Sequence, residues 1–481
     1  MDTSYPELQF YIGGQWVDRE DRQTYPVINP ATEEVLGELP RATPADVAAA
    51  IEAARRGFEV WRKVSGLERG RLLRRTAELL RQKYDRLATL ITLEMGKPIR
   101  DSRAEVDTAI GMFEWFAEEA RRGYGRLIPP RAGGFREMVV WEPVGPVAGF
   151  SGWNAAAITP ARKISGALAA GCSLVLKPSR ETPASALVVA QAVVEAGVPA
   201  GVLNVIFGDS GRISQELLES PVIRKITFTG ATSVGKRLSS LAVQSMKRMT
   251  MELGGHAPVV IFPDVDPAKV AASAVAAKFR SAGQICTSPT RFFIHQDIYL
   301  PFVDAFAAEA RKLPIGNGLE EHVRMGPVAN LPRLEAMERL VQDARERGVA
   351  IATGGRRIGE RGYFFEPTLL VDFPDDCLAA TQEPFGPLAL ARSFRTFDEA
   401  VALANHLPVG LASYAFTKDL ATATAIGDAI DCGNVAINHW RVSLPETPFG
   451  GVKDSGLGLE GGIEGLQSFQ KLKFISQASG S

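Results

Sequence analysis

Short apolar runs that alternate with helical segments constrain the fold of this chain more than any other feature of its sequence. The runs cover residues 146–150, 173–177, 203–208 and 225–230. Segments with helical periodicity lie between them, around 160–170, 183–196 and 211–219. This alternation predicts an α/β fold with a parallel sheet connected by right-handed crossovers. Ligands of such sheets bind beyond the carboxyl ends of the strands, so we expect the chemistry there.

The regions on either side extend this organisation, and a length of 481 residues predicts two or three domains. Before the sheet, helical periodicity covers residues 45–64, 68–95 and 101–125. Thr43 and Pro44 supply a cap and a first-turn proline for the first of these helices. After the sheet, we expect a second α/β unit from about 256 to 436, with β runs that include 291–295 and 366–373.

Two β-like segments, 135–145 and 469–476, lie outside these units. The first is typical of a strand or hairpin arm, and the second is a lone β run near the end of the sequence. A lone terminal strand usually pairs with another element, often on a second subunit. We therefore expect a homo-oligomer, either a dimer or a tetramer.

Charge and composition exclude several classes of protein. The formal net charge is −1 and 23% of the residues are charged, so there is no basic field for nucleic acid and no single-sign field for a charged membrane. The first residues contain no basic and apolar signal segment. The longest small-apolar run, 165–176, is too short to span a bilayer and is broken by glycine. We expect neither a nucleic-acid nor a membrane partner.

Cysteine usage argues against a metal site. The four cysteines are Cys172, Cys286, Cys377 and Cys432. They form no CxxC pair and no Cys/His cluster with metal-ligand spacing, so we expect no metal. This usage fits a reducing, cytoplasmic setting.

Cys286 lies in a loop of small and polar residues, 280-RSAGQICTSPTR-291. A core cysteine would have apolar neighbours, whereas Thr287 and Ser288 follow this one. Gly283 allows the backbone to approach another segment closely. Two interpretations are open from the loop alone: a half-buried thiol in a surface loop, or a reactive nucleophile.

Two turns at predicted strand ends suit a nucleotide. Lys177 ends the run 173–177, and a lysine at such an edge reaches a ribose hydroxyl or a phosphate. The run 225–230 leads into a glycine turn that opens a helix, whose free N–H groups favour a phosphate. Any α/β protein has such turns, so each signal alone is weak. The GxGxxG pattern at 456–461 follows no apolar strand, and we interpret it as a glycine-rich turn.

Glu252, Trp153 and Asn154 are further candidates. Glu252, in 251-MELGGH-256, is either a solvated surface charge or a general base held between two units. Trp153 and Asn154 follow the run 146–150. Core packing is the plain interpretation of Trp153. Asn154 is either a turn residue or helix cap, or an amide that donates to a developing oxyanion.

Seven motifs follow one another along the chain, namely WN at 153–154, KPS at 177–179, FTGxxxVG at 228–235, ELGG at 252–255, GQxC at 283–286, EPFGP at 383–387 and PFGGxKxSG at 448–456. In this order they resemble the aldehyde dehydrogenase superfamily over nearly the whole chain. The resemblance is closest to the branch that oxidises semialdehydes of dicarboxylic acids, such as succinic semialdehyde and 2-oxoglutarate semialdehyde. It implies a Rossmann-like cofactor domain (1–122 and 143–251), an α/β catalytic domain (252–440) and a small β oligomerisation element (123–142 and 464–481).

The resemblance also implies a role for each motif residue. Cys286 is the expected nucleophile, Glu252 the general base and Asn154 the side-chain oxyanion donor, beside the backbone N–H of Cys286. The expected cofactor contacts are Trp153, Lys177, Ser179, Arg180, Gly230, Ser233, Glu383 and Phe385. Lys177 is expected at the adenosine ribose and Glu383 at the nicotinamide ribose.

These residue types match the oxidation of an aldehyde to a carboxylic acid. Attack by a thiolate makes the carbonyl carbon tetrahedral, and its hydrogen can then leave as hydride. An Asn amide and a backbone N–H supply two donors to the alkoxide, each worth about 3–4 kcal/mol. Water, assisted by Glu252, then hydrolyses the thioester. This chemistry requires no metal.

In the semialdehyde branch, two arginines and a serine hold the substrate carboxylate, and the matching positions are Arg162, Arg280 and Ser443. The alternative for either arginine is a structural ion pair. Many relatives read PWNFP where this chain reads 152-GWNAA-156. The missing proline is expected to loosen the turn that aims Asn154, and the missing aromatic to widen the substrate tunnel. A bulkier or aromatic aldehyde is therefore an alternative substrate.

Two single positions bear on the cofactor and on regulation. NAD-specific relatives often carry a glutamate at the position of Arg180, where it bonds the ribose hydroxyls and repels a 2′-phosphate. An arginine removes that repulsion and adds a cation, so we expect NADP to be accepted and preferred over NAD. Some relatives carry a second cysteine at the position of Ser288, and the serine excludes a disulfide between these two positions.

Three rival functions are weaker. A cofactor-independent thiol esterase would use Cys286 and Glu252 but not Lys177, Ser233 or Glu383. A non-catalytic structural protein would not need Cys286 and Glu252. An acylating dehydrogenase would pass the thioester to coenzyme A, whereas Glu252 favours water.

Overall fold

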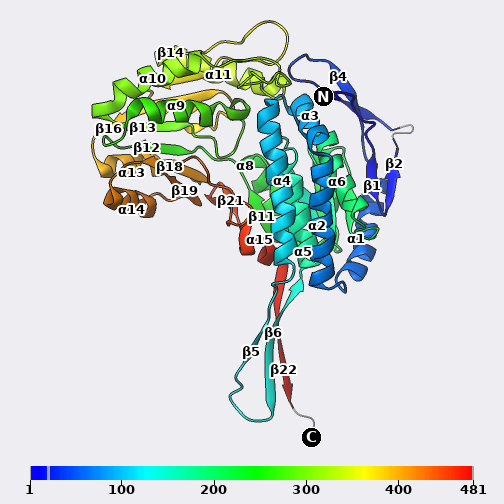
Figure 1. Ribbon diagram of the computed structural model, residues 1–481. Helices are drawn as coiled ribbons and strands as arrows, with labels where there is room; N and C mark the ends of the chain where they lie inside the picture. The colour runs from blue at the N-terminus through cyan, green and yellow to red at the C-terminus, as the bar shows by residue number, and fades with distance from the viewer. Residues whose placement is uncertain (1, 19–21, 479–481) are drawn as a thin grey trace.

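The computed structural model describes residues 2–18 and 22–478. The chain forms two α/β units, each built on a large sheet, and a narrow three-stranded sheet that projects away from them (Figure 1). Two clusters of buried apolar side chains form the cores, one around each large sheet. The α/β fold class predicted from the alternating runs is confirmed.

The first sheet has eight strands in the order β2-β1-β9-β8-β7-β10-β11-β21. Its strands are β1 (Phe10–Ile12), β2 (Gln15–Val17), β7 (Val147–Phe150), β8 (Leu174–Lys177), β9 (Leu203–Val205), β10 (Lys225–Thr229), β11 (Arg248–Glu252) and β21 (Gly456–Leu457). The four apolar runs form the parallel strands β7 to β10. At the carboxyl edge, Phe150 lies beside Lys177 and Thr229 beside Glu252, so the predicted site residues share one edge.

Helices pack around this sheet, namely α1 (Pro44–Trp61), α2 (Gly66–Gln82), α3 (Tyr84–Met95), α4 (Ile99–Glu119), α5 (Ile158–Ala170), α6 (Pro183–Glu195), α7 (Ser210–Glu219) and α8 (Thr232–Gln244). Thr43 caps α1 in a capping box with Asp46. The single helix expected over 68–95 is wrong, because Lys83 leaves the helical conformation (φ −97°, ψ 13°) and separates α2 from α3. The helix expected to reach 125 ends at Glu119, before the backbone of Gly125 packs against Val139.

The second sheet has seven strands in the order β14-β15-β16-β13-β12-β18-β19, all parallel except the β14–β15 pair. The strands are β12 (Pro258–Ile261), β13 (Arg291–His295), β14 (Ala350–Thr353), β15 (Thr368–Val371), β16 (Leu388–Phe394), β18 (Ala412–Phe416) and β19 (Asn434–Ile437). Its helices are α9 (Pro267–Lys278), α10 (Tyr299–Arg311), α11 (Leu331–Glu346), α12 (Leu378–Thr381), α13 (Phe397–Asn405) and α14 (Leu420–Ala429), with 3₁₀ turns at η1 (Arg280–Gly283) and η2 (Gln296–Ile298).

The projecting sheet joins distant parts of the chain in the order β22-β6-β5. It consists of β5 (Arg126–Ile128), β6 (Phe135–Pro143) and β22 (Gln470–Ala478). The lone terminal strand thus pairs with β6 of its own chain, antiparallel, from Gln470 opposite Pro143 to Ala478 opposite Phe135. Leu472 and Phe474 on β22 are 54% and 58% exposed. Residues 479–481 of the predicted oligomerisation element lie outside the described residues, as do 1 and 19–21 of the predicted cofactor domain.

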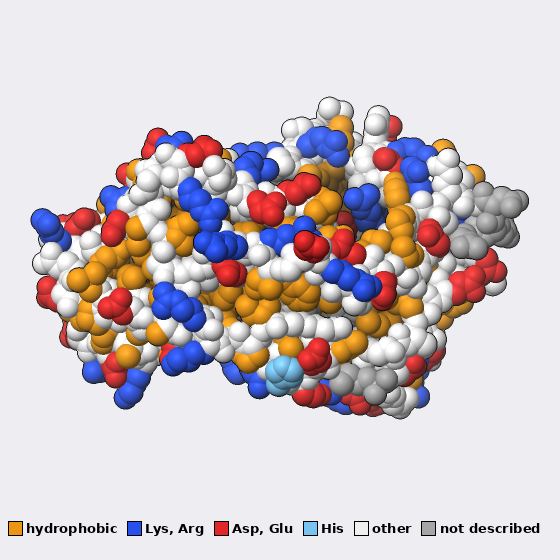
Figure 2. Space-filling view, turned by 90° about the horizontal axis from the view of Figure 1, so that it is seen from above, with side chains coloured by type: hydrophobic (Ala, Val, Ile, Leu, Met, Phe, Trp, Pro, Cys, Tyr) orange, Lys and Arg blue, Asp and Glu red, His pale blue; other side chains and the backbone are white. Residues whose placement is uncertain are grey.

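The remaining elements are small, namely the hairpin of β3 (Thr24–Ile28) and β4 (Val35–Pro40), the pair β17 (Val409–Gly410) and β20 (Val452–Lys453), and the helix α15 (Gly462–Ser468). On the face seen in Figure 2, Lys and Arg side chains are interspersed with Asp and Glu, with hydrophobic groups between them. Within residues 2–18 and 22–478, no helix has the length and apolar character needed to cross a membrane.

Candidate active site

Glu252 ends β11 at the carboxyl edge of the first sheet and is 3% exposed. Within the described residues, neither of its carboxylate oxygens has a hydrogen-bond partner. Burial raises the pKa of Glu252 well above its ordinary value, the charge of Glu460 raises it further, and Arg162 and Lys163 oppose the rise. A solvated surface charge is therefore the wrong interpretation of this residue. A buried carboxylate with free lone pairs is suited to taking a proton near neutral pH.

The Cys286 loop follows a left-handed backbone segment. Ser281, Ala282 and Gly283 have φ values of 50°, 53° and 71° and are buried. Gly283 packs directly against the carbonyl oxygen of Gly386, which is the close approach that its glycine predicted. The non-glycine residues Ser281 and Ala282 pay for this conformation in backbone strain, typical of functional sites.

Cys286 itself is half-buried, and its loop contacts the segment that follows Glu252. A Cβ atom at Gly255 would lie 3.1 Å from the carbonyl oxygen of Cys286, so only glycine fits there without a shift. Burial raises the pKa of the Cys286 thiol to about 12, the charges of Glu383 and Glu252 contribute, and Arg162 opposes them. In this environment the thiol is neutral at pH 7 and needs a base to become a nucleophile.

The turn that carries Asn154 lies between β7 and α5. The buried Lys97 ammonium donates to the backbone carbonyl of Asn154 at 2.9 Å and forms an ion pair with Glu105. Glu105 in turn accepts from the backbone N–H of Ala157 at 2.7 Å. A buried ion pair therefore anchors both sides of a turn that lacks proline. On the neighbouring residue, the ring of Trp153 meets Phe385 at 5.4 Å between centroids.

Glu383 lies beside the backbone that connects Glu252 to the second sheet. A Cβ atom at Gly254 would lie 2.6 Å from its Oε2. Burial raises the pKa of Glu383 to about 8, whereas a hydrogen bond with the Gly255 backbone and the charge of Lys278 lower it. Phe385, two residues on, has a left-handed φ of 45°.

The carboxyl edge of the first sheet has donors that fit a dinucleotide. Lys177 is 8% exposed, donates to Ser210 Oγ at 2.6 Å, and has its pKa lowered to about 8 by burial. The buried hydroxyl of Ser151, which follows β7, has no hydrogen-bond partner in the part of the chain that the structure describes. Helix α8 begins without a side-chain cap, so its first N–H groups are not satisfied by the residue before it, and Ser233 there is exposed.

Ser179 and Arg180 both contact a residue that no motif singled out. Ser179 Oγ donates to Glu181, and Arg180 Nε lies 3.4 Å from Glu181 Oε1. The Arg180 guanidinium also lies over the ring of Tyr25, 5.5 Å from its centroid. Gly230 donates its backbone N–H to the carbonyl of Glu252 at 3.0 Å, which joins the turn before α8 to the end of β11.

Of the three predicted substrate residues, the structure joins two. Arg162 Nη2 donates to Ser443 Oγ at 2.9 Å, and its guanidinium lies over the ring of Phe449 at 4.8 Å. Arg162 is buried and forms an ion pair with Glu460 at 3.9 Å, and among the described residues its Nε has no hydrogen-bond partner. Arg280 is exposed and lies near Asp101. Burial raises the pKa of Asp101, and the positive charge of Arg280 opposes this rise.

Sequence reasoning missed Glu460 and Lys163. Lys163 is fully buried and donates to Glu460 at 2.7 Å, and Thr227 donates to the same carboxylate oxygen at 2.8 Å. Burial opposes ionisation of Glu460, but Lys163 and Arg162 lower its pKa below the ordinary value. The 456–461 segment begins with β21, which pairs antiparallel with β11 and places Gly456 opposite Glu252. This pairing of distant segments places the carboxylate of Glu460 near Glu252, which the sequence alone did not indicate.

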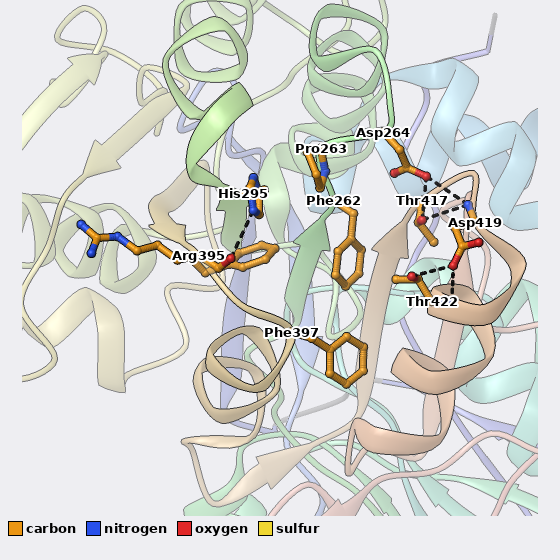
Figure 3. A pocket seen from close by; sticks show the side chains of 10 residues that line it. Phe262, Pro263, Asp264, His295, Arg395, Phe397, Thr417, Asp419 and Thr422 are labelled. Carbon is orange, nitrogen blue, oxygen red and sulfur yellow. Dashed lines mark hydrogen bonds between the residues drawn. The ribbon is translucent and has the colours of Figure 1, made fainter.

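A surface cavity of about 370 Å³ lies at the carboxyl edge of the second sheet, beyond the ends of β12, β13, β16 and β18 (Figure 3). Its polar groups satisfy one another: Asp264 accepts from Thr417 and from two backbone N–H groups, and Asp419 caps α14. Cys286 and Glu252 precede β13 and β12, so they lie at the other edge. The reactive residues therefore do not line this cavity.

Comparison with known proteins identifies the class of enzyme. The family model described as the aldehyde dehydrogenase family matches residues 16–475, so the chain belongs to this family and is an NAD(P)-dependent oxidoreductase of aldehydes. It is 45% identical to a putative 4-(hydroxymethyl)benzenesulfonate dehydrogenase of Comamonas testosteroni, and 38% identical to the NADP⁺ succinate-semialdehyde dehydrogenase of Escherichia coli, over 98% of each chain in both cases. The structure is similar to that of an NADP-dependent enzyme of E. coli, with a TM-score of 0.96 at 38% identity over 99% of both chains.

Proposed function

We propose that this enzyme oxidises an aldehyde with an anionic group at its far end, such as succinic semialdehyde, to the carboxylic acid. The observation that supports this most is the buried Arg162, which is bonded to Ser443 and retains an unpartnered Nε. Glu460 Oε2 lies 3.9 Å from Nη1 of Arg162 and supplies one anionic partner, and the Nε N–H leaves a donor for a second anionic or polar group. The similarity to semialdehyde dehydrogenases at 38–40% identity points to the same substrate class.

In the proposed reaction, Cys286 attacks the carbonyl carbon and forms a thiohemiacetal. The Asn154 amide and the backbone N–H of Cys286 donate to the resulting alkoxide, and together they replace the water that would otherwise solvate it. The anchored turn at Lys97 and Glu105 holds Asn154 in place for this role. A nicotinamide cofactor held by Glu383 and Phe385 would supply the acceptor for the hydride of the tetrahedral carbon, which would leave a thioester on Cys286.

Glu252 performs the proton transfers in this scheme. Its carboxylate first takes the thiol proton and releases it to solvent before the thioester is hydrolysed. The regenerated carboxylate then takes a proton from the water that attacks the thioester, and Cys286 leaves as the thiolate. Among the described residues neither oxygen has a hydrogen-bond partner, and the raised pKa makes the carboxylate a stronger base than an ordinary glutamate. The thiol esterase rival would need the same two residues, and it predicts ester hydrolysis without any dinucleotide.

For the cofactor, we propose that Lys177, Ser179 and Arg180 hold the adenosine ribose, and that Trp153, Gly230 and Ser233 line the pyrophosphate. Glu383 and Phe385 would hold the nicotinamide end. NADP is accepted and preferred in this proposal, because Arg180 offers a cation to a 2′-phosphate. The test is the ratio of kcat/KM for the two dinucleotides: Arg180→Glu should shift it toward NAD, and a strong parental preference for NAD that the variant leaves unchanged would refute it.

The division of labour in the fold is part of the same proposal. Residues 1–122 and 143–251 would bind the cofactor, residues 252–440 would carry the catalytic cysteine, and residues 123–142 and 464–481 would mediate oligomerisation. The exposed apolar side chains of β22, Leu472 and Phe474, support a contact with another subunit.

The substrate proposal is tested with pairs of aldehydes that differ only in the distal charge. Succinic semialdehyde is compared with butanal at equal chain length, in the parent, in Arg162→Lys and in Ser443→Ala. The ratio of the two kcat/KM values should fall about tenfold or more in Arg162→Lys, because lysine cannot form the same fork. Faster oxidation of butanal by the parent would show that Arg162 does not recognise a carboxylate. Arg280→Met in the same assay tests the second arginine.

A second candidate substrate is an aromatic aldehyde with a distal anion. The benzenesulfonate name of the 45% identical relatives favours it, and so does the small Ala155 at a position where many relatives have an aromatic ring. Adding 4-carboxybenzaldehyde and benzaldehyde to the panel separates the two candidates. The aromatic proposal requires 4-carboxybenzaldehyde to exceed succinic semialdehyde in kcat/KM.

A further inference from the structure

Glu181 lies in the turn between β8 and α6, directly after the KPSR segment. One oxygen of its carboxylate accepts from Ser179 Oγ, and the other lies 3.4 Å from Arg180 Nε. A single carboxylate thus accepts hydrogen bonds from two of the side chains that we propose for the ribose end of the cofactor. Its side chain is 23% exposed, so solvent or a ligand can reach it.

Two cationic side chains, Arg180 and Lys177, lie near this carboxylate. The charge of Glu181 opposes the fall that burial causes in the pKa of Lys177, which places the two groups within electrostatic range. The guanidinium groups of Arg180 and Arg41 both lie over the ring of Tyr25, at 5.5 Å and 4.7 Å from its centroid. Stacking on Tyr25 gives Arg180 a second support that does not depend on Glu181. The cluster resembles an anion site in which the chain itself supplies the anion.

We infer that Glu181 sets how strongly the enzyme discriminates between the two dinucleotides, by competing with a 2′-phosphate for Ser179 and Arg180. A phosphate would have to displace the carboxylate and would be repelled by it, whereas a neutral 2′-hydroxyl can donate to it. The inference rests on the proposed assignment of Lys177, Ser179 and Arg180 to the ribose. Arg180 favours the binding of NADP and Glu181 opposes it. The preference of the parent enzyme for one dinucleotide is therefore the balance of these two contributions.

The test measures binding rather than turnover. Dissociation constants for NADP, NAD and the fragment 2′,5′-ADP are determined by isothermal titration calorimetry on the parent and on Glu181→Gln. The variant should bind NADP and 2′,5′-ADP about tenfold more tightly and NAD within about twofold of the parent. Because the effect is electrostatic, the gain in affinity for 2′,5′-ADP should shrink in 0.5 M salt, where the Debye length is only a few ångströms.

Glu195→Gln is the matched control. Glu195 ends α6 in the same unit, and its carboxylate forms an ion pair with Lys83 at 3.0 Å. This variant should leave all three dissociation constants unchanged. Thermal unfolding of every variant reports on folding, and Glu181→Ala, which also lacks the carboxylate, should shift the binding in the same direction as Glu181→Gln.

The result that overturns the inference is an NADP to NAD affinity ratio in Glu181→Gln and Glu181→Ala equal to that of the parent. Arg180→Glu separates this failure from failure of the cofactor proposal. If Arg180→Glu changes the ratio and the Glu181 variants do not, only the role of Glu181 is wrong. If none of them changes it, the assignment of this turn to the ribose is wrong as well, and both ideas fall together.

Discussion

The rings of Trp153 and Phe385 meet edge to face, with centroids 5.4 Å apart and ring planes at 87°. This contact joins the turn after β7 of the first sheet to the segment before β16 of the second. Each ring lies next to a proposed site residue, Asn154 on one side and Glu383 on the other. Such pairs contribute about 0.5–1.5 kcal/mol beyond the buried area. The two loops are therefore held together where the proposed oxyanion and nicotinamide contacts must meet.

Replacing Cys286 by serine should abolish aldehyde oxidation, with kcat falling by at least about a thousandfold, because a hydroxyl is a much weaker nucleophile than a thiolate. Steady-state formation of reduced dinucleotide measures this. Cys432, also half-buried, provides the control, and Cys432→Ser should retain activity. Turnover of Cys286→Ser close to that of the parent would contradict the covalent scheme.

The reactivity of Cys286 without cofactor should depend steeply on pH. Burial and the charges of Glu383 and Glu252 raise its pKa to about 12, whereas a free cysteine has a pKa near 8.5. Alkylation by iodoacetamide, followed by mass spectrometry of the Cys286 peptide, should be slow at pH 7 and still rising at pH 9.5. At pH 9, Glu383→Gln should react faster because one raising charge is gone. A rate that levels off near pH 8.5 would show an ordinary thiol.

Replacing Glu252 by glutamine should make the protein more stable at alkaline pH while it slows the reaction. The folded-state pKa of Glu252 lies above the ordinary value of about 4.3, so the folded protein keeps a proton that the unfolded chain loses. The free energy of unfolding therefore falls as pH rises from about 4.3 towards the folded pKa. Glutamine removes this loss, and Tm at pH 8 should rise by about 1–3 °C. If the parent and the variant had the same Tm at pH 5 and also the same Tm at pH 8, the pKa of Glu252 would not be raised in the folded protein.

Replacing Glu460 by glutamine should shift the pH profile of kcat. The charge of Glu460 raises the pKa of Glu252, so its removal lowers that pKa and the base ionises at lower pH. The acidic limb should move down by about 0.5–1 pH unit. Lys163→Gln should move the limb in the opposite direction, because Lys163 lowers the pKa of Glu252. An acidic limb that stays in place in both variants would mean that this pair does not control the base.

Introducing charge on β22 should disrupt the proposed oligomer. Leu472 and Phe474 are more than half exposed. An exposed apolar strand face of this kind is typical of a surface that contacts another subunit. The double variant Leu472→Glu, Phe474→Glu should sediment as a smaller species than the parent in analytical ultracentrifugation. Lys473→Ser, on the intervening residue that pairs with Glu142, serves as the control. Identical sedimentation of the parent and the double variant would place the subunit contact elsewhere.

Local patterns in the sequence were enough to predict the sheet and most of its helices. The runs at 146–150 and 173–177 form adjacent parallel strands because buried strands need apolar residues and connecting helices need a 3.6-residue period. The same reasoning failed at Lys83, where one long apolar period continues through a break in the backbone. Periodicity reports which face is buried, and it does not report a change of dihedral angle at one residue.

The motif residues were found because each lies at a turn whose chemistry is local: Lys177 at a strand end, Glu252 before two glycines, Cys286 among small neighbours. Their partners were not predictable in this way. Lys163 and Glu460 are buried against each other although 297 positions separate them. The Lys97–Glu105 pair reaches the Asn154 turn from helix α4 and the segment that precedes it. A buried charge is tolerated only when folding supplies its partner, and that partner can come from any part of the chain. The sequence by itself therefore determined the layers and the reactive residue types, while the tertiary structure alone decided which carboxylates and cations act on one another, because electrostatic interaction depends on distance and burial in three dimensions.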